Sequence, residues 1–355
     1  MTRSSADDAA PRGRSRRNFA GARPVMDDVA RLAGVSKQTV SRVLNDHPSV
    51  RAETRETVLA AMRTLGYRPS RSARSLASGR TRMVGVISFD AARYGPASIL
   101  TAINTAAQEA GYLLSSIALD TADPDTVVEA VNRLSAEGAD GVIAIAPQLW
   151  VGKALADTRL DTPLVVLENG LDTDTQQVTG DSRTGARKAT EHLLGLGHRT
   201  VWHLAGPTGW TSADYRMEGW QACLRAAGAE VPVPLIGDWS AGSGYELGRH
   251  LARRPDVTAV FVSNDQMALG LLHALHEAGR DVPGDVSVVG YDDIPEARHF
   301  LPPLTTVRTD FAEIGTRSLR LLLTRLDGAS APPRADSLVP VDLVVRRSSG
   351  PAPGR

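Results

Sequence analysis

The stretch Val25-Met-Asp-Asp-Val-Ala-Arg-Leu-Ala-Gly-Val-Ser-Lys-Gln-Thr-Val-Ser-Arg-Val-Leu44 predicts two short helices joined at a glycine. In its first half Val29, Leu32 and Ala33 recur at helical spacing and share one apolar face. Gly34 ends this helix, because glycine adopts the left-handed conformation of a helix C-cap without strain. The pattern is typical of a helix-turn-helix, whose second helix enters the major groove of DNA.

The second half of this stretch supplies an inward stripe and an outward polar face. Ser36 is placed to cap the helix, and Val40, Val43 and Leu44 point inward. The remaining side chains are suited to contacts with DNA, since glutamine bonds adenine and arginine bonds guanine bidentately. They are Lys37, Gln38, Ser41 and Arg42, followed by Asn45. An ordinary solvated helical hairpin would present similar side chains, so the motif alone leaves both interpretations open.

Charge is distributed unevenly along the chain. The whole sequence carries 40 Lys and Arg against 40 Asp and Glu, and its formal net charge is zero. Residues 1 to 82 nevertheless hold 17 basic against 7 acidic side chains, which leaves 23 against 33 for the remainder. A basic front joined to an acidic body indicates a phosphate-binding domain attached to a soluble sensor or enzyme.

Composition favours a globular protein of the reducing cytoplasm. The chain has 355 residues, of which 42% are hydrophobic, enough for more than one domain. Its single cysteine, Cys223, cannot form an intramolecular disulfide and is interpreted as a small core residue. No apolar run reaches membrane-spanning length and no secretion signal is recognisable. We therefore expect a cytoplasmic, nucleoid-associated protein without a membrane contact.

The N-terminal quarter divides into an arm, a module and a linker. Residues 1–22 are rich in Arg, Ser, Gly and Pro and are expected to be a disordered basic arm. Residues 23–68 form the helix-turn-helix domain, completed by a third helix from Ala52 to Leu65 that Gly66 ends. Residues 69–81 are mostly polar, and Leu76 is their single large apolar side chain, without a helically spaced partner to pack on. A plain linker is the simplest interpretation of this segment.

Five short motifs in this region resemble the lactose-repressor (LacI/GalR) family of bacterial regulators. They are Asp-Val-Ala, Ala-Gly-Val-Ser, Thr-Val-Ser-Arg-Val-Leu-Asn, Leu-Gly-Tyr-Arg-Pro and Ala-Arg-Ser-Leu, in this order. The resemblance implies that residues 69–81 fold into a hinge helix on operator DNA. It also implies that Leu76 is wedged into the minor groove, where an inserted apolar side chain kinks the duplex.

Beyond residue 82 apolar strands alternate with amphipathic helices. Strands are expected at Met83–Phe89, Leu113–Leu119, Gly141–Ala146, Leu164–Leu167, Val201–Ala205, Ala259–Ser263 and Val286–Tyr291. Helices are expected at Pro96–Ala110, Pro124–Glu137, Thr184–Leu196, Ala213–Ala227, Gln266–Ala278 and Asp310–Leu326. This alternation predicts an α/β fold with parallel sheets and a ligand cleft at the strands' C-terminal ends.

The family resemblance implies how these strands and helices are divided into domains. It implies that residues 82–346 form a periplasmic-binding-protein-like, sugar-binding regulatory domain. Two parallel-sheet subdomains are expected in it, with crossovers near residues 180 and 309. Residues 347–355, Arg-Ser-Ser-Gly-Pro-Ala-Pro-Gly-Arg, are expected to be a disordered tail. This tail lacks apolar heptads, so a homodimer rather than a larger assembly is expected.

Aromatic and polar side chains gather at the predicted strand ends and helix starts. Together they offer flat rings for the apolar face of a pyranose and paired donors and acceptors for its hydroxyls. They are Phe89, Glu168, Trp210, Arg216, Trp239, Asn264 and Asp292. Structural roles remain open, because Trp239 could be a half-buried core residue and Asn264 could begin a helix.

Further motifs extend the resemblance over the body: Leu-Ala-Gly-Pro, Gly-Asp-Trp-Ser-Ala, Asn-Asp-Gln-Met-Ala-Leu-Gly, Ser-Val-Val-Gly-Tyr-Asp-Asp and Pro-Pro-Leu-Thr-Thr. It implies that Arg216, Asn264 and Asp292 bond sugar hydroxyls. It places Ser212 and Glu168 at further contact positions and gives aromatic contacts to Trp239 and Phe311. Departures from relatives at contact positions occur at Phe89, Arg93, Ile145, Trp210 and Thr309. The added rings favour a longer or differently linked saccharide, unless Trp210 fills the site instead.

The expected function is sequence-specific regulation of transcription. The resemblance favours a repressor of carbohydrate-utilisation genes that a glycoside or disaccharide inducer releases from a palindromic operator. No enzymatic activity, cofactor or metal site is expected. The alternatives are a sugar-binding protein of another class and a regulator that a corepressor activates. A sugar-processing enzyme would need a catalytic pair, for which Glu168 and Asp292 are the nominal candidates.

Overall fold

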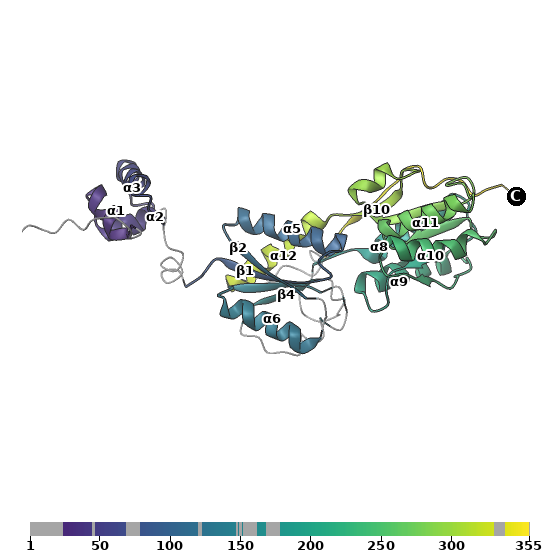
Figure 1. The fold of residues 1–355 in the computed structure, drawn as a ribbon, viewed down its shortest axis with the longest axis horizontal. Coiled ribbons are helices and arrows are strands. Elements are labelled where there is room, and N and C mark those ends of the chain that lie inside the picture. Colours follow the sequence, from purple (N-terminus) through teal and green to yellow (C-terminus); the bar gives the residue numbers. More distant parts are fainter. Residues whose placement is uncertain are drawn as a thin grey trace, which may run out of the picture. The chain divides into compact units, whose positions relative to one another are not determined.

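The computed structural model describes residues 24–44, 47–68, 79–119, 123–146, 148, 151, 162–167, 178–329 and 338–354. The chain forms two compact units, Met1–Arg80 and Thr81–Arg355 (Figure 1). The expected arm and most of the hinge segment lie outside the described residues, as do Asn45, Leu76 and Glu168. No helix among the described residues is long and apolar enough to cross a membrane.

The first unit contains the helices α1 (Met26–Ala33), α2 (Lys37–Leu44) and α3 (Ala52–Leu65). Gly34 and Gly66 end α1 and α3 in the left-handed conformation, with φ of 65° and 63°. Ser36 caps α2 as expected, because its Oγ accepts the Thr39 N–H at 3.1 Å. Val29, Val40 and Val58, one from each helix, are fully buried in the core. The three predicted helices are thereby confirmed.

The second unit begins with a parallel four-stranded sheet of described residues, ordered β2-β1-β3-β4. Its strands are β1 (Met83–Phe89), β2 (Leu113–Leu119), β3 (Gly141–Ile145) and β4 (Leu164–Leu167). Val84 and Val86 of β1 face α5 (Tyr94–Glu109) and α12 (Phe311–Leu326), whereas Ile87 and Phe89 face α6 (Pro124–Ala136). Figure 1 shows α5 and α12 on one side of this sheet and α6 on the other. Apolar residues on both faces of β1 explain its continuous apolar sequence.

A six-stranded sheet of described residues follows, ordered β12-β10-β9-β8-β6-β7. Its strands are β6 (Trp202–Ala205), β7 (Leu235–Ile236), β8 (Ala259–Val262), β9 (Ser287–Asp292), β10 (Thr305–Thr309) and β12 (Val341–Val344). Its faces are covered by α8 (Ser182–Gly195), α9 (Thr211–Ala226), α10 (Ala241–Ala252) and α11 (Asp265–Glu277). Only β12 among these strands runs antiparallel to its neighbour, β10. The α/β class and the two sheet subdomains are therefore confirmed.

The chain passes between the two subdomains at three described places. It crosses at β5 (Thr179–Gly180), again between β10 and α12, and a third time at β11 (Leu338–Val339), which pairs in parallel with β5. The third crossing was not anticipated from the sequence. Because α12 packs on the first sheet, residues from the last third of the chain complete the core of the first subdomain.

The expectation of a disordered C-terminal tail is wrong for residues 347–354. Ser348 is fully buried and its backbone C=O accepts the Val288 N–H at 2.7 Å. Its hydroxyl donates to the Val288 C=O at 2.6 Å and accepts the Thr305 N–H at 2.8 Å. The Gly350 N–H donates to Ser287 Oγ at 3.0 Å. This segment is held by hydrogen bonds to the sheet rather than by apolar side chains. Its hydropathy therefore gave no indication that it is ordered.

Candidate functional site

The outward face of α2 carries the residues expected to contact DNA. Lys37, Gln38 and Arg42 are exposed and Ser41 is half-buried, because the buried Val40 and Val43 set the rotation of the helix. Lys37 Nζ lies 3.2 Å from Asp27 Oδ1 of α1, and both side chains are more than half exposed. Such an exposed ion pair contributes little to stability. Lys37 can therefore exchange the Asp27 carboxylate for a DNA phosphate at a small cost in free energy. Asn45 and Leu76 lie outside the described residues.

A cavity of about 50 Å³ lies between the two subdomains, at the C-terminal ends of their strands. Its wall comes from the starts of α5, α9, α11 and α12, the end of β9 and the segment before α10. Seven of the predicted ligand-binding residues are brought together here: Trp210, Ser212, Arg216, Trp239, Asn264, Asp292 and Phe311. This is the edge at which ligands bind in parallel α/β sheets.

Phe89 is not part of this wall, which corrects the expectation from the sequence. Its side chain is 1% exposed and packs with Val127 and Val131 of α6. As the last residue of β1 it was expected to face the cleft, but the alternation of the strand turns it toward α6. Ile145 is likewise a fully buried core residue. Glu168 lies outside the described residues.

A buried ion pair lies at the centre of the cavity wall. Arg216 Nη2 is 3.2 Å from Asp292 Oδ1, and the two side chains are 8% and 9% exposed. Arg216 Nη1 donates to the Ser263 C=O, and the guanidinium lies 3.7 Å from the centroid of the Tyr291 ring. Burial raises the pKa of Asp292, and the Arg216 charge opposes that shift. The pair presents a charged donor and a charged acceptor side by side in a largely dry site.

The turn that carries Asp292 is held in an unusual backbone conformation. Asp292 and Asp293 have φ of 101° and 53°, which side chains larger than glycine rarely adopt. The Asp293 carboxylate accepts from Arg308 Nε at 2.7 Å and from Arg346 at 2.6 Å. The buried Asp265 accepts the Ile294 N–H at 2.9 Å and the Thr306 hydroxyl at 2.6 Å. These bonds tie β9, α11 and β10 together directly behind the ion pair.

The aromatic part of the wall contains two indoles in contact. Trp210 and Trp239 meet edge to face, with ring centroids 5.7 Å apart. Asn264 has both of the roles considered from the sequence. Its Oδ1 caps α11 by accepting the Met267 N–H at 2.9 Å, and the residue also lines the cavity. Its Nδ2 donates to the Trp239 C=O at 3.0 Å. The helix cap therefore also positions the Trp239 backbone.

Arg93 Nε of the wall makes no hydrogen bond among the described residues, but it lies 3.9 Å from Asp90 Oδ1. Two other N–H donors of the wall, Arg216 Nε and Trp239 Nε1, have neither a hydrogen-bond partner nor an ion-pair partner there, and both are shielded from solvent. Buried polar groups in folded proteins are nearly always paired, so each such group needs an explanation. Acceptor atoms of a bound ligand would satisfy both donors, and a hydroxyl-rich molecule supplies such acceptors.

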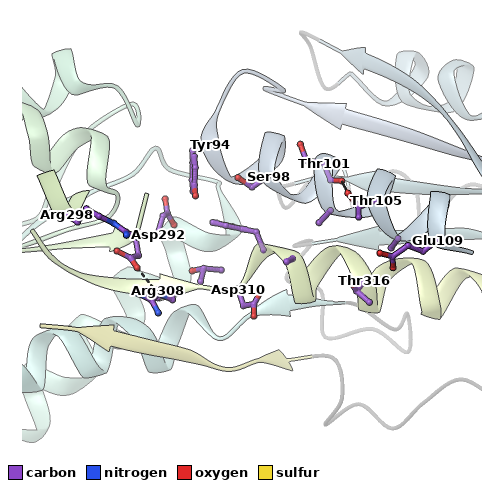
Figure 2. A pocket seen from close by; sticks show the side chains of 16 residues that line it. Tyr94, Ser98, Thr101, Thr105, Glu109, Asp292, Arg298, Arg308, Asp310 and Thr316 are labelled. Atoms are coloured by element: carbon purple, nitrogen blue, oxygen red, sulfur yellow. Dashed lines mark hydrogen bonds and ion pairs between the residues drawn. The ribbon is translucent and has the colours of Figure 1, made fainter. Parts of the chain in front are cut away.

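A larger groove of about 850 Å³ adjoins the cavity. Figure 2 shows its labelled side chains: Tyr94, Ser98, Thr101, Thr105 and Glu109 from α5, Thr316 from α12, and Asp292, Arg298, Arg308 and Asp310 beyond them. Tyr94, Asp292 and Phe311 line both spaces. The Tyr94 ring stands on edge against Phe311, with centroids 5.7 Å apart.

Some wall residues escaped the sequence analysis as ligand candidates. Tyr94 and Gln266 line the cavity from the starts of α5 and α11. Gln266 had been assigned only to the beginning of a helix, and Tyr94 falls between the expected first strand and the helix after it and received no assignment. Both residues closely follow a strand in the sequence, and this position was the one signal that could have identified them as cavity residues. Gln148 forms an antiparallel bridge with the backbone of Trp210 from the other subdomain, and nothing in its local sequence indicates this contact.

Comparisons with known proteins agree with this geometry. Residues 25–70 match the model of bacterial regulatory proteins of the lacI family, and residues 190–349 match a periplasmic binding protein-like domain. The chain is 36% identical over 326 residues to the lactose operon repressor of Escherichia coli K12, covering 91% of this chain and 89% of the repressor. It is 34% identical over 342 residues to the transcriptional regulator CelR of Thermobifida fusca, covering 92% and 98% of the two chains.

Two solved structures have the same architecture. A lac repressor dimer bound to operator and the anti-inducer ONPF matches with a TM-score of 0.81 and 35% identity, over 92% of this chain and 99% of that one. A CelR–cellobiose complex matches with a TM-score of 0.68 and 32% identity, over 92% and 100%. These relatives are transcriptional regulators rather than enzymes. The chain belongs to the lacI family of bacterial regulatory proteins and is a DNA-binding transcriptional regulator with an effector site in its body.

Proposed function

We propose that this regulator represses carbohydrate-utilisation genes and that a sugar inducer, a glycoside or disaccharide, releases it from a palindromic operator. It acts as a homodimer on the nucleoid, where two copies of α2 contact the half-sites through Lys37, Gln38, Ser41 and Arg42. Asn45 and Leu76 are proposed to add contacts, Leu76 in the minor groove. The body binds the inducer through the cavity residues, joined by Glu168.

The observation that carries this proposal is the Arg216–Asp292 pair in an aromatic-walled cavity. A pyranose has an apolar face that packs on a ring such as Trp239, and a rim of hydroxyls that both donate and accept. Asp292 and Asn264 can accept from such hydroxyls, whereas Arg216 Nε and Trp239 Nε1 can donate to their oxygens. The names of two relatives, the lactose operon repressor and the CelR–cellobiose complex, support a saccharide with more than one ring.

The mechanism is a shift of population between two arrangements of the subdomains. A sugar bound between them stabilises one arrangement, and operator DNA stabilises the other. Because the wall combines side chains from both subdomains, relative movement of the subdomains changes the affinity for sugar.

The test separates DNA contacts from sugar contacts in the full chain. The operator is selected from random duplexes, and release is measured with a saccharide panel that includes lactose and cellobiose. Arg42→Ala should lose about 1–3 kcal/mol of preference for the selected operator and still bind sugar. Asp292→Asn should bind operator normally and resist release. Asp342→Asn, which changes an exposed carboxylate outside the cavity, is the control. Normal release of the Asp292 variant, or no release of the wild type by any saccharide, would contradict the proposal.

A further inference from the structure

The cavity is too small for the ligand that its chemistry suits. Its volume is about 50 Å³, whereas a benzene-sized ring needs an apolar cavity of roughly 150 Å³ and small-molecule pockets span roughly 300–1,000 Å³. The described conformation can hold a water molecule or two beside Arg216 and Trp239. The adjoining groove of about 850 Å³ has room for a sugar beside Asp292, but a sugar can pack against Trp239 and Arg216 inside the small cavity only if part of its wall moves.

Trp210 and Trp239 are the two largest side chains of the cavity wall. The Trp210 ring stands with its centroid 5.7 Å from that of Trp239, at an interplanar angle of 65°. Another side of Trp239 is closed by Gly206, where an added Cβ would fall 2.2 Å from the indole. Arg216 occupies a further side, 5.6 Å from the Trp239 ring centroid. Trp210 therefore lies where a sugar would approach the Trp239 ring.

The Trp210 side chain takes no part in the hydrogen bonds that begin α9, whereas its backbone C=O accepts the Asp214 N–H at 2.9 Å. Trp210 is the N-cap residue of this helix and makes no side-chain capping bond. Its N–H reaches the Pro207 C=O at 3.4 Å, a long hydrogen bond. The preceding Gly209 has φ of 82° and open space around its Cβ position. By contrast Trp239 is 6% exposed and its C=O is fixed by Asn264.

Trp210 also joins the two subdomains. Its backbone forms the antiparallel bridge with Gln148, which follows β3 of the first subdomain. Gln148 Nε2 donates to Asp90 Oδ2 at 3.4 Å, and Asp90 directly follows β1. The backbone of Trp210 is thus connected through Gln148 to Asp90, at the end of β1 in the other sheet.

We propose that Trp210 is the gate of the effector site: its indole occupies the sugar's place against Trp239 until the effector displaces it and loosens the bridge to Gln148. The inference rests on the proposed function, because it takes a saccharide as the effector. In this role Trp210 sets the selectivity of the site by size and controls entry. Only molecules with an open gate bind sugar. The apparent association constant is therefore the intrinsic constant multiplied by the fraction of molecules whose gate is open.

The experiment measures sugar binding to the full chain by calorimetry and by stopped-flow fluorescence, with cellobiose and lactose as probes. Trp210→Ala should raise the association rate constant and the affinity roughly tenfold or more, with little change in the dissociation rate constant. Trp210→Phe should give intermediate values, because a smaller ring blocks less of the cavity. Trp202→Phe, which changes an indole outside the cavity, should match the wild type.

Two outcomes would contradict the proposal that Trp210 is a gate. Faster dissociation and a tenfold loss of affinity in Trp210→Ala would make Trp210 a stacking platform, and unchanged kinetics would make it a bystander. If no probe binds the wild type or the variant, the proposed function fails, and indole then tests the gate alone. Trp210→Ala should bind indole in the emptied space, as apolar cavities bind small rings, whereas the wild type should not. Failure of the variant to bind indole would refute the gate independently of the sugar.

Discussion

At the scale of single residues, burial decides how the polar side chains of the body behave. His203 of β6 is fully buried, its Nδ1 lies 3.0 Å from the Phe261 C=O, and its ring stacks on Phe261 with centroids 4.8 Å apart. Burial lowers its pKa from 6.5 to about 4, the bond to Phe261 opposes that shift and the Arg216 charge adds to it. The imidazole is therefore neutral in the folded protein at neutral pH.

This depressed pKa predicts acid sensitivity of the fold. Unfolded His203 takes up its proton near pH 6.5 and the folded one near pH 4, so its contribution to stability is complete above pH 6.5 and disappears as the pH falls toward 4. The expected loss of unfolding free energy by pH 4 is about 3 kcal/mol. Urea unfolding from pH 7 to 4 should show a flatter pH dependence for His203→Phe than for the wild type. The exposed His273→Phe is the control, and equal slopes for both variants would contradict the prediction.

At the scale of elements, glycines decide how closely α10 and α11 approach. A Cβ at Gly244 would fall 2.2 Å from the Met267 C=O, and one at Gly270 would fall 2.0 Å from the Ala241 C=O. Both contacts are with backbone, which cannot step aside as a flexible side chain can. Gly244, together with Gly242 and Gly248, weakens the apolar periodicity of residues 241–252, and for this reason the sequence did not predict α10.

This close approach predicts opposite effects for two glycine substitutions in helices. Gly270→Ala should lower the unfolding free energy by about 1–3 kcal/mol, because α10 and α11 must move apart. Gly195→Ala, at the end of α8 with open space around it, should raise stability by about 0.4–1 kcal/mol through lower entropy of the unfolded chain. Urea midpoints at constant m-value measure both. A neutral Gly270→Ala would show that the helix contact adapts more readily than its geometry implies.

At the scale of the whole molecule, operator and sugar compete through one equilibrium. Linkage requires that the factor by which sugar weakens operator affinity equals the factor by which operator weakens sugar affinity. We expect this factor to be about 5–150, which corresponds to 1–3 kcal/mol of coupling. Fluorescence titration of cellobiose into free and operator-bound protein measures one side, and operator titration with and without cellobiose measures the other. The coupling would be excluded if free and operator-bound protein bound cellobiose with equal affinity although cellobiose released the protein from the operator.

Local sequence was sufficient for much of the architecture. The cap at Ser36 and the glycines 34 and 66 mark helix ends through local backbone chemistry, which neighbouring residues alone determine. Strands and helices covered on an apolar face were predicted within about two residues, as at Met83–Phe89 and Leu113–Leu119. By contrast β10 and β12 were not predicted. Threonines and an arginine interrupt the apolar pattern of β10 and Asp342 interrupts that of β12, and the sheet pairing stabilises both strands instead.

By itself the sequence determined the order of most elements, the α2 face and most of the cavity residues, because local periodicity, helix caps and position after a strand depend on neighbours along the chain. Only the tertiary structure decided which of those residues meet. It turned Phe89 into the core, ordered residues 347–354 by hydrogen bonds to the sheet, and brought Trp210 against Trp239 and Gln148. Those outcomes depend on contacts between residues far apart in the chain, and local sequence cannot specify them.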